Sequence, residues 1–202
     1  FETRLAEIVG VKYAVGVASG YHALHLSMLA AGLGPGDEVI TVAHTFVATI
    51  SAIVHCGATP VLVDVGPDYN IDPDSLDRAI TPRTKAIVPV HLNGRVANMA
   101  RVMEAAERHG LLVIEDAAQA LGATFDGRGA GSFGLTGCFS FYPFKLLGCF
   151  GDGGAVTTNQ HLFDIAVVTP VFFKGRLVGL TATVGNVADI GGTKDWLHAR
   201  EV

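Results

Sequence analysis

Clusters of basic residues, paired cysteines and membrane-length apolar stretches are all missing from this sequence. The net charge is −5, and without a basic run the chain lacks the electrostatic footprint of a nucleic-acid-binding protein. The three cysteines are odd in number and have no CxxC spacing, which argues against a disulfide framework and a zinc site. They indicate the reduced thiols of a cytoplasmic protein, and we expect no metal site. The longest apolar stretch, residues 165–173, is too short to cross a bilayer, so no membrane partner is expected.

No signal peptide is expected either, because residues 1–4 include neither a basic segment nor the start of an apolar one. Apolar residues, by contrast, are abundant. They make up 50% of the chain, only 16% of residues are charged, and 202 residues suffice for one sizeable domain with a hydrophobic core. This composition is typical of a buried sheet covered by helices.

Strand-like and helix-like segments alternate from residue 11 to about residue 123. Short apolar runs predict strands over residues 13–18, 38–42, 59–64, 85–90 and 111–115. Helices are predicted between them, over about 23–29, 45–55, 72–80 and 98–109. We therefore predict an α/β fold of three layers, α/β/α, with a mainly parallel sheet. Ligands of such sheets bind at the carboxyl ends of the strands.

The pattern changes after residue 134. Strands are predicted over 138–142 and 155–158, joined by the glycine-rich segment 148–154. Residues 167–192 contain many glycines, valines and threonines without clear periodicity and support no assignment. We divide the chain into a domain over residues 1–160 and an unassigned tail over 161–202.

One lysine has an unusually apolar setting. Lys145 follows Phe141-Tyr142-Pro143-Phe144 and precedes Leu146-Leu147-Gly148. A lone lysine is usually a solvated surface residue. Apolar neighbours would remove water from its amine and suit it to imine formation and proton transfer.

Three further polar positions fall at predicted strand ends. Asp116 follows the strand over 111–115, where a carboxylate can stabilise a protonated pyridine nitrogen, although a helix N-cap is the common alternative. Ser19-Gly20 ends the first strand and opens a helix whose N–H groups and dipole suit a phosphate. Ser140 is placed to add a hydroxyl to the same phosphate, or is an ordinary strand serine.

Two other side chains have both a functional and a structural interpretation. Phe46 is placed to stack on a cofactor ring, or belongs to the core. His91 ends the strand over 85–90 and either faces the site or is structural. His22 and His25 form no metal-ligand pattern.

Taken together, the segments resemble the DegT/DnrJ/StrS group of nucleotide-sugar aminotransferases, which are homodimeric enzymes with the pyridoxal-phosphate (PLP) aspartate-aminotransferase-type fold. The resemblance covers about residues 1–160 and is carried by residues 18–24, 34–40, 45–49, 88–92, 115–119, 131–134, 139–145 and 151–154. It implies that the first domain is the PLP-binding large domain and that the usual C-terminal small domain is missing.

The resemblance implies that Lys145 is the Schiff-base lysine, that Asp116 pairs with the pyridine nitrogen and that Gln119 lies near the ring hydroxyl. It implies transfer of an amino group from an amino acid, usually glutamate, to a keto-sugar nucleotide or related keto-cyclitol, with Lys145 as general acid and base. Some relatives that dehydrate sugars carry histidine there, so Lys145 favours transamination. A PLP-dependent sugar dehydratase and a catalytically incomplete PLP-binding fragment are the alternatives.

The resemblance also places Gly20, Tyr21 and Ser140 on the phosphate and Phe46 over the ring face. Tyr21 departs from the small hydroxyl residue usual there, so the backbone alone is expected to make that phosphate contact. Phe144 and Leu146 flank the lysine where threonine and asparagine are typical. Because the tail does not resemble the group, we expect a fragment or a frame-altered C-terminus.

Overall fold

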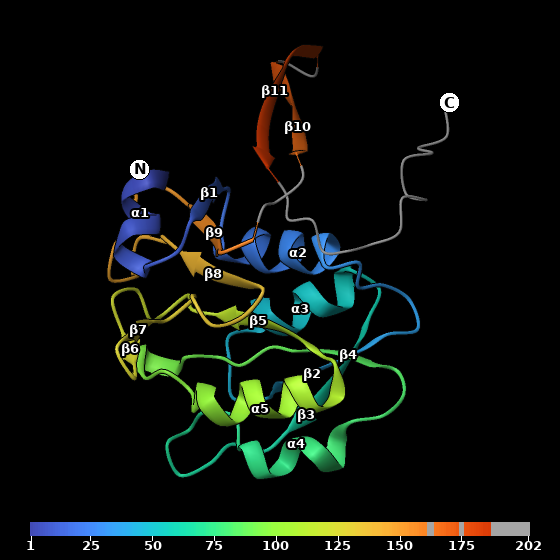
Figure 1. The fold of residues 1–202 in the computed structure, drawn as a ribbon. Coiled ribbons are helices and arrows are strands. Elements are labelled where there is room, and N and C mark those ends of the chain that lie inside the picture. The colour runs from blue at the N-terminus through green and yellow to red at the C-terminus, as the bar shows by residue number, and fades with distance from the viewer. Residues whose placement is uncertain (161–163, 174–175, 187–202) are drawn as a thin grey trace. The chain divides into compact units, whose positions relative to one another are not determined.

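The computed structural model describes residues 1–160, 164–173 and 176–186. The chain divides into two compact units, Phe1–Asn159 and Gln160–Val202, and each is described by itself. The first unit contains a seven-stranded sheet of order β1-β9-β8-β5-β4-β2-β3 (Figure 1). Its strands are β1 (Tyr13–Val17), β2 (Glu38–Val42), β3 (Thr59–Val63), β4 (Thr84–Ile87), β5 (Leu112–Asp116), β8 (Thr136–Ser140) and β9 (Gly154–Thr158).

Neighbouring strands from β8 through β5, β4 and β2 to β3 are parallel, and β9 runs antiparallel to both β8 and β1. The prediction of a mainly parallel sheet is confirmed. The helices of this unit are α1 (Glu2–Val9), α2 (Gly20–Ala30), α3 (Val47–His55), α4 (Pro73–Ala79) and α5 (Met99–His109), with a 3-10 turn η1 (Leu92–Gly94).

The two faces of the sheet are covered by different helices. Val39 and Ile114 belong to a buried cluster with residues of α2 and α3. Their chain neighbours Ile40 and Val113 belong to a second cluster with residues of α4 and α5. Successive strand residues point to opposite faces, so the helices form one layer on each side of the sheet (Figure 1). The three-layer prediction is confirmed.

Two elements of the first unit were not predicted. Helix α1 packs Leu5 and Val9 into a buried cluster with Phe139, a tertiary contact that local periodicity does not reveal. The short hairpin β6 (Thr124–Phe125) and β7 (Arg128–Gly129) turns at residues 126–127, which both have positive φ angles of 49° and 78°. An Asp-Gly pair is the sequence signature of this turn, and it was available in the sequence.

The predicted strand over 85–90 is too long. Strand β4 ends at Ile87, and Pro89 has no N–H with which to continue the ladder. The Pro89 carbonyl still accepts a hydrogen bond from the backbone N–H of Asp116, at 2.9 Å. The segment after β4 therefore stays beside β5, although it has left regular pairing.

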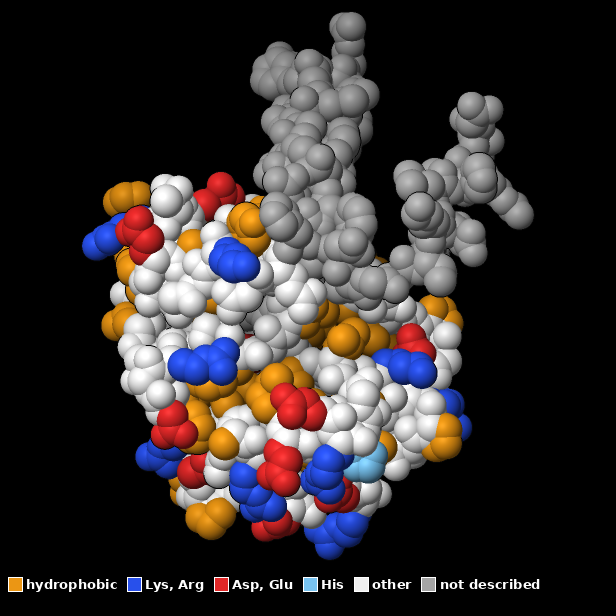
Figure 2. All heavy atoms as spheres, in the orientation of Figure 1, with side chains coloured by type: hydrophobic (Ala, Val, Ile, Leu, Met, Phe, Trp, Pro, Cys, Tyr) orange, Lys and Arg blue, Asp and Glu red, His pale blue; other side chains and the backbone are white. Residues whose placement is uncertain are grey.

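Ion pairs join the two helices that cover the second face of the sheet. Arg101 of α5 lies 2.6 Å from Asp74 of α4, and Arg108 lies 3.1 Å from Asp77. Figure 2 shows acidic and basic side chains interspersed over this part of the surface. Within the described part of the chain, no helix has the length and hydrophobicity needed to cross a membrane.

The second unit contains an antiparallel hairpin of β10 (Asp164–Phe173) and β11 (Arg176–Asn186), with an irregularity between Val171 and Phe172. Part of the stretch 167–192 that the sequence left unassigned therefore forms strands, and residues 187–192 lie outside the described residues. The division of the chain at residue 160 stays a prediction.

Candidate active site

A cavity of about 490 Å³ opens at the carboxyl ends of the parallel strands. Its walls come from the segments that follow β1, β2, β4, β5 and β8, which is where an α/β sheet binds its ligands. All seven residues predicted to hold or use the cofactor line it: Gly20, Tyr21, Phe46, Asp116, Gln119, Ser140 and Lys145. Their individual roles stay predictions.

Close packing of a glycine creates a cradle at one end of the cavity. A Cβ atom at Gly20 would lie 2.7 Å from the Cβ of Ser140, so only glycine lets the start of α2 approach the end of β8. The Ser19 side chain caps α2 by accepting a hydrogen bond from the N–H of His22 at 3.2 Å. The N–H groups of Gly20 and Tyr21 have no acceptor within the helix. Gly20 packs against Ser140, and unsatisfied N–H groups at a helix start are suited to binding an anion.

The Tyr21 side chain is engaged elsewhere. Its hydroxyl forms a 2.7 Å hydrogen bond with Nδ1 of His55 at the end of α3. Its ring stacks on that of His25, with 5.6 Å between centroids. The Tyr21 side chain is therefore already engaged, and a contact of its backbone N–H with a phosphate stays a prediction.

Asp116 is the last residue of β5, and its side chain is almost fully buried. Its Oδ2 accepts a hydrogen bond from the hydroxyl of Thr49 at 2.7 Å, and Oδ1 accepts one from the N–H of Ala118 at 3.2 Å. No helix begins here, since residues 117–119 form a turn. The N-cap alternative is therefore excluded.

Burial raises the pKa of Asp116 above its ordinary value, because the charged form loses its hydration. The hydrogen bonds from Thr49 and Ala118 oppose this effect, and the positive charge of Lys145 also lowers the pKa. A buried carboxylate that is costly to ionise gains most from a cationic partner, so this end of the cavity suits a protonated ring nitrogen.

Lys145 lies in the loop 141–153 between β8 and β9, and its side chain is half-buried. The loop is closed by hydrogen bonds from the N–H of Phe141 to the carbonyl of Gly153, at 2.7 Å, and from the N–H of Lys145 to the carbonyl of Tyr142, at 2.8 Å. The expectation that apolar flanks bury the lysine is wrong. Phe144 is 90% exposed and Leu146 is 83% exposed, although Phe144 still lines the cavity.

The amide of Gln119 is oriented by a neighbouring turn. Its Oε1 accepts a hydrogen bond of 2.7 Å from the backbone N–H of Asn93, a residue with a left-handed φ of 53°. The amide nitrogen is then the end available to a ligand. Phe46 immediately precedes α3 at the cavity and is 66% exposed, so it is not a core residue.

His91 does not face the cavity. Its side chain has no exposed surface and its Nε2 lies 2.9 Å from a carboxylate oxygen of Glu115, which confirms the structural interpretation. Thr49 and Thr45, whose hydroxyl oxygens lie 2.7 Å apart, were not among the predicted site residues. Their spacing of four residues in the helix predicted over 45–55 would have placed them side by side, although α3 begins only at Val47 and Thr45 precedes it.

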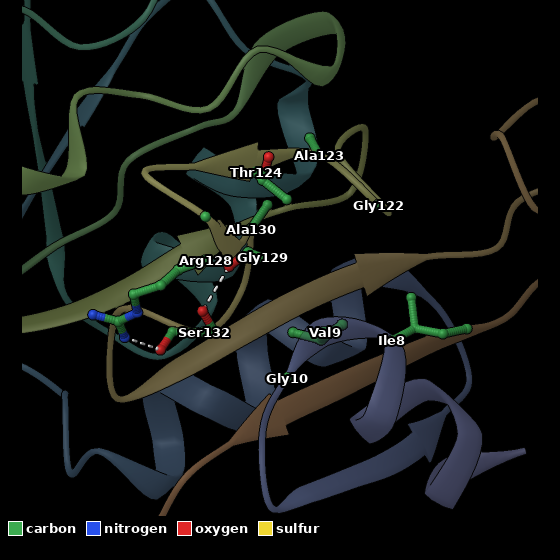
Figure 3. A pocket seen from close by; sticks show the side chains of 11 residues that line it. Ile8, Val9, Gly10, Gly122, Ala123, Thr124, Arg128, Gly129, Ala130 and Ser132 are labelled. Carbon is green, nitrogen blue, oxygen red and sulfur yellow. Dashed lines mark hydrogen bonds between the residues drawn. The ribbon is translucent and has the colours of Figure 1, made fainter.

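A second cavity, of about 270 Å³, lies between the end of α1 and the β6–β7 hairpin (Figure 3). Arg128 is the one charged residue among those that line it. Its guanidinium donates to the carbonyl of Ser132 at 2.7 Å and lies 4.3 Å from the centre of the Phe133 ring. Because the Arg128 guanidinium is already held by a carbonyl and an aromatic ring, this cavity offers no acid–base chemistry comparable to that of the first cavity.

Comparison with known proteins gives two family matches. Residues 1–169 match the family described as DegT/DnrJ/EryC1/StrS aminotransferase, and residues 154–196 match the one described as hydantoinase B/oxoprolinase. The GDP-perosamine synthase of Caulobacter vibrioides is 50% identical in an alignment 219 positions long, which covers 100% of this chain and 58% of that protein. The chain spans about half the length of the curated relatives it matches.

Two solved structures are similar to the first unit. DesV of S. venezuelae has a TM-score of 0.76 and 51% identity, covering 78% of this chain and 43% of that chain. NtdA of Bacillus subtilis, solved with its cofactor PMP bound, has a TM-score of 0.74 and 40% identity, covering 78% of this chain and 36% of that chain.

Proposed function

The chain belongs to the DegT/DnrJ/EryC1/StrS aminotransferase family, and from this premise we propose that it forms the cofactor-binding part of a PLP-dependent aminotransferase. One observation carries the proposal: a single cavity collects a lysine, a buried aspartate and a glycine-lined helix start. PLP chemistry needs an amine to attach the cofactor, a carboxylate for the pyridine nitrogen and an anion site for the phosphate.

The residues present fit this cofactor. The space beside Ser140 exists because position 20 has no Cβ, and the first N–H groups of α2 border it. We propose that Gly20, Tyr21 and Ser140 hold the phosphate there. At the other end, Asp116 would face the ring nitrogen and the amide nitrogen of Gln119 would donate to the ring oxygen.

When bound, PLP supplies an electron-withdrawing ring and a carbon that takes up an amino group from one substrate for delivery to another. Asp116 would hold the proton on the ring nitrogen by its negative charge. Phe46 would cover one face of the ring. Lys145 would attach the cofactor through Nζ and then move a proton at that atom between the reacting carbons, as general base and general acid.

We propose that the acceptor is a keto-sugar nucleotide or a related keto-cyclitol and that the donor is an amino acid, glutamate first among candidates. The name of the Caulobacter relative, a GDP-perosamine synthase, supports a nucleotide-linked sugar. The residue that lines the cavity at position 145 is a lysine and not a histidine. This supports transamination over sugar dehydration.

Cofactor attachment is tested by adding PLP, recording the visible spectrum, reducing with borohydride and mapping the labelled peptide by mass spectrometry. Label on the Lys145 peptide, lost in Lys145→Arg and kept in the exposed control Lys85→Arg, supports the proposal. Label scattered over surface lysines, or no absorbance band, contradicts it.

Reaction type is tested with ¹⁵N-labelled glutamate and a keto-sugar nucleotide. Nitrogen recovered in the sugar supports transamination. Loss of water from the sugar without nitrogen transfer identifies a dehydratase. Cofactor binding with neither reaction identifies the chain as a catalytically incomplete fragment.

We also propose a cytoplasmic homodimer. Phe144, Leu146 and Phe150 are exposed on the lysine loop, and a second copy of the chain would remove these apolar groups from water. Two of the three free cysteines are buried, as suits a reducing compartment. A sedimentation experiment should give a dimer that Phe144→Ser with Leu146→Ser weakens. A monomer at all concentrations would contradict the homodimer.

A further inference from the structure

Thr49 is the side chain that contacts Asp116 most closely. It is fully buried in α3, and its hydroxyl oxygen lies 2.7 Å from Oδ2 of Asp116, although the two residues are 67 positions apart in the chain. We propose that Thr49, held in turn by Thr45, is a positioning residue that fixes the Asp116 carboxylate for the cofactor ring. The inference rests on the proposed function and assigns a role to a residue outside the predicted set.

The direction of each hydrogen bond follows from the chemistry of the groups. An ionised carboxylate only accepts, so Thr49 donates its single hydroxyl proton to Asp116. The 2.7 Å bond between the two threonine hydroxyls must then have Thr45 as donor and Thr49 as acceptor. Thr45 lines the cavity. A chain of two hydroxyls thus runs from the cavity wall to the buried carboxylate.

The two hydroxyl groups fix the Asp116 carboxylate in a defined orientation. Thr49 binds Oδ2 and the N–H of Ala118 binds Oδ1, so rotation of the carboxyl group would break both bonds. The remaining lone pairs are left for a ligand in the cavity, which Asp116 also lines. Hydrogen bonds to an ionised group are the stronger kind, and both Thr49 and Asp116 are buried.

The hydroxyl also favours ionisation. Burial raises the pKa of Asp116, and the Thr49 hydroxyl is the largest influence that lowers it again. The other titratable groups near this carboxyl are His91, after β4, Lys145, on the loop after β8, and the buried thiol of Cys138 on β8. The positive charge of Lys145 also favours the charged form of Asp116. Loss of the hydroxyl leaves Ala118 as the remaining hydrogen-bond donor to the side chain among the described residues.

A purely structural threonine would behave differently, and the chain offers a matched comparison. Thr41 on β2 is equally buried, and its hydroxyl donates to the carbonyl of Val88 at 2.9 Å, without contacting Asp116. Thr41→Val and Thr49→Val remove the same group at the same burial. Thr49→Ser keeps the hydroxyl at the position where it is needed.

The decisive measurement is the titration of the Asp116 carboxyl by NMR in ¹³C-labelled protein without added cofactor. In Thr49→Val we expect its midpoint to move up by about one pH unit or more. Thr49→Ser and Thr41→Val should titrate like the wild type. A midpoint in Thr49→Val equal to that in Thr41→Val would overturn the proposal. Because no cofactor is present, this result does not depend on the proposed function.

Cofactor binding gives a second reading. The PLP dissociation constant at neutral pH should rise about tenfold in Thr49→Val and stay within about twofold in Thr49→Ser. If the wild type binds no PLP, the proposed function fails, while the titration still decides the role of Thr49. If Thr49→Val does not fold, Thr45→Val replaces it. A smaller upward movement of the Asp116 midpoint is then expected, and no movement would overturn the proposal.

Discussion

His91 donates a hydrogen bond from Nε2 to Oε2 of Glu115 over 2.9 Å, and neither side chain has any exposed surface. The N–H of Ala97 donates to Nδ1 of the same ring at 3.2 Å, so the ring proton lies on Nε2. Glu115 also accepts hydrogen bonds from the backbone N–H groups of residues 131, 133 and 134. The residue next to Asp116 is therefore held by four donors.

Glu115→Gln should destabilise the fold strongly. Each carboxylate oxygen accepts two of the four hydrogen bonds, so an amide nitrogen in place of either oxygen would face two donors. We expect a loss of about 3–5 kcal/mol in the free energy of unfolding, measured by urea denaturation followed by circular dichroism. Glu107→Gln, on the exposed face of α5, is the control and should stay within about 0.5 kcal/mol. A loss below about 1 kcal/mol for Glu115→Gln would show that the network contributes little.

Gly20→Ala should impair binding of the cofactor phosphate. The new Cβ would come within 2.7 Å of the Ser140 Cβ, which forces the start of α2 away from β8. We expect the PLP dissociation constant to rise at least about tenfold, by spectroscopic titration, from loss of hydrogen bonds to a charged group. Gly16→Ala is the control, because its Cβ would meet Glu2 at an ordinary 3.5 Å. Equal PLP binding by both variants would show that the phosphate does not bind between Gly20 and Ser140.

Gln119→Glu should weaken PLP binding while leaving the fold intact. One carboxylate oxygen can still accept from the N–H of Asn93, but the other replaces the amide nitrogen that faces the ligand. Repulsion of an ionised ring oxygen should raise the dissociation constant about tenfold. Asn98→Asp makes the same chemical change at the exposed N-cap of α5 and should bind like the wild type. Tighter binding by Gln119→Glu would mean that the ring oxygen lies elsewhere.

His25→Leu should make the fold less sensitive to acid. Burial lowers the pKa of His25 from its ordinary value of 6.5. A hydrogen bond with the His55 backbone acts against this, and the charges of His55 and His22 lower the pKa further. A lowered folded-state pKa contributes stability above pH 6.5 that is lost as the pH falls through the folded value. The free energy of unfolding of His25→Leu, minus that of the wild type, should therefore increase as the pH is lowered from 7.5 to 5.5. Denaturation measured at each pH gives both values. A difference that does not change with pH would contradict the assignment.

Much of the layered fold could be predicted from periodicity. Continuous apolar runs predicted the strands, because both of their faces are buried. Apolar residues every three to four positions predicted the helices, because one of their faces is buried. The strand over 38–42 was predicted with the bounds of β2, and the helix ending at 109 ends with α5. The boundary near Pro89 was missed, since the loss of one N–H matters only once the neighbouring strand is known.

The candidate site divides in the same way. Residues at strand ends, such as Asp116 and Ser140, could be selected from the sequence because a parallel sheet brings all carboxyl ends to one edge. The exposure of Phe144 and Leu146 could not be predicted, because the conformation of an irregular loop follows from backbone hydrogen bonds that no periodicity encodes.

Periodicity in the sequence was enough to predict the strands and helices between residues 13 and 116, and which of them carry a carboxylate or a helix start at the cavity. The side-chain partners became known from the three-dimensional packing alone: Thr49 for Asp116, Glu115 for His91 and His55 for Tyr21. The physical reason is range. Burial patterns are set by neighbours a few residues apart, whereas a hydrogen bond between side chains 67 positions apart exists only when α3 packs on the sheet in one register.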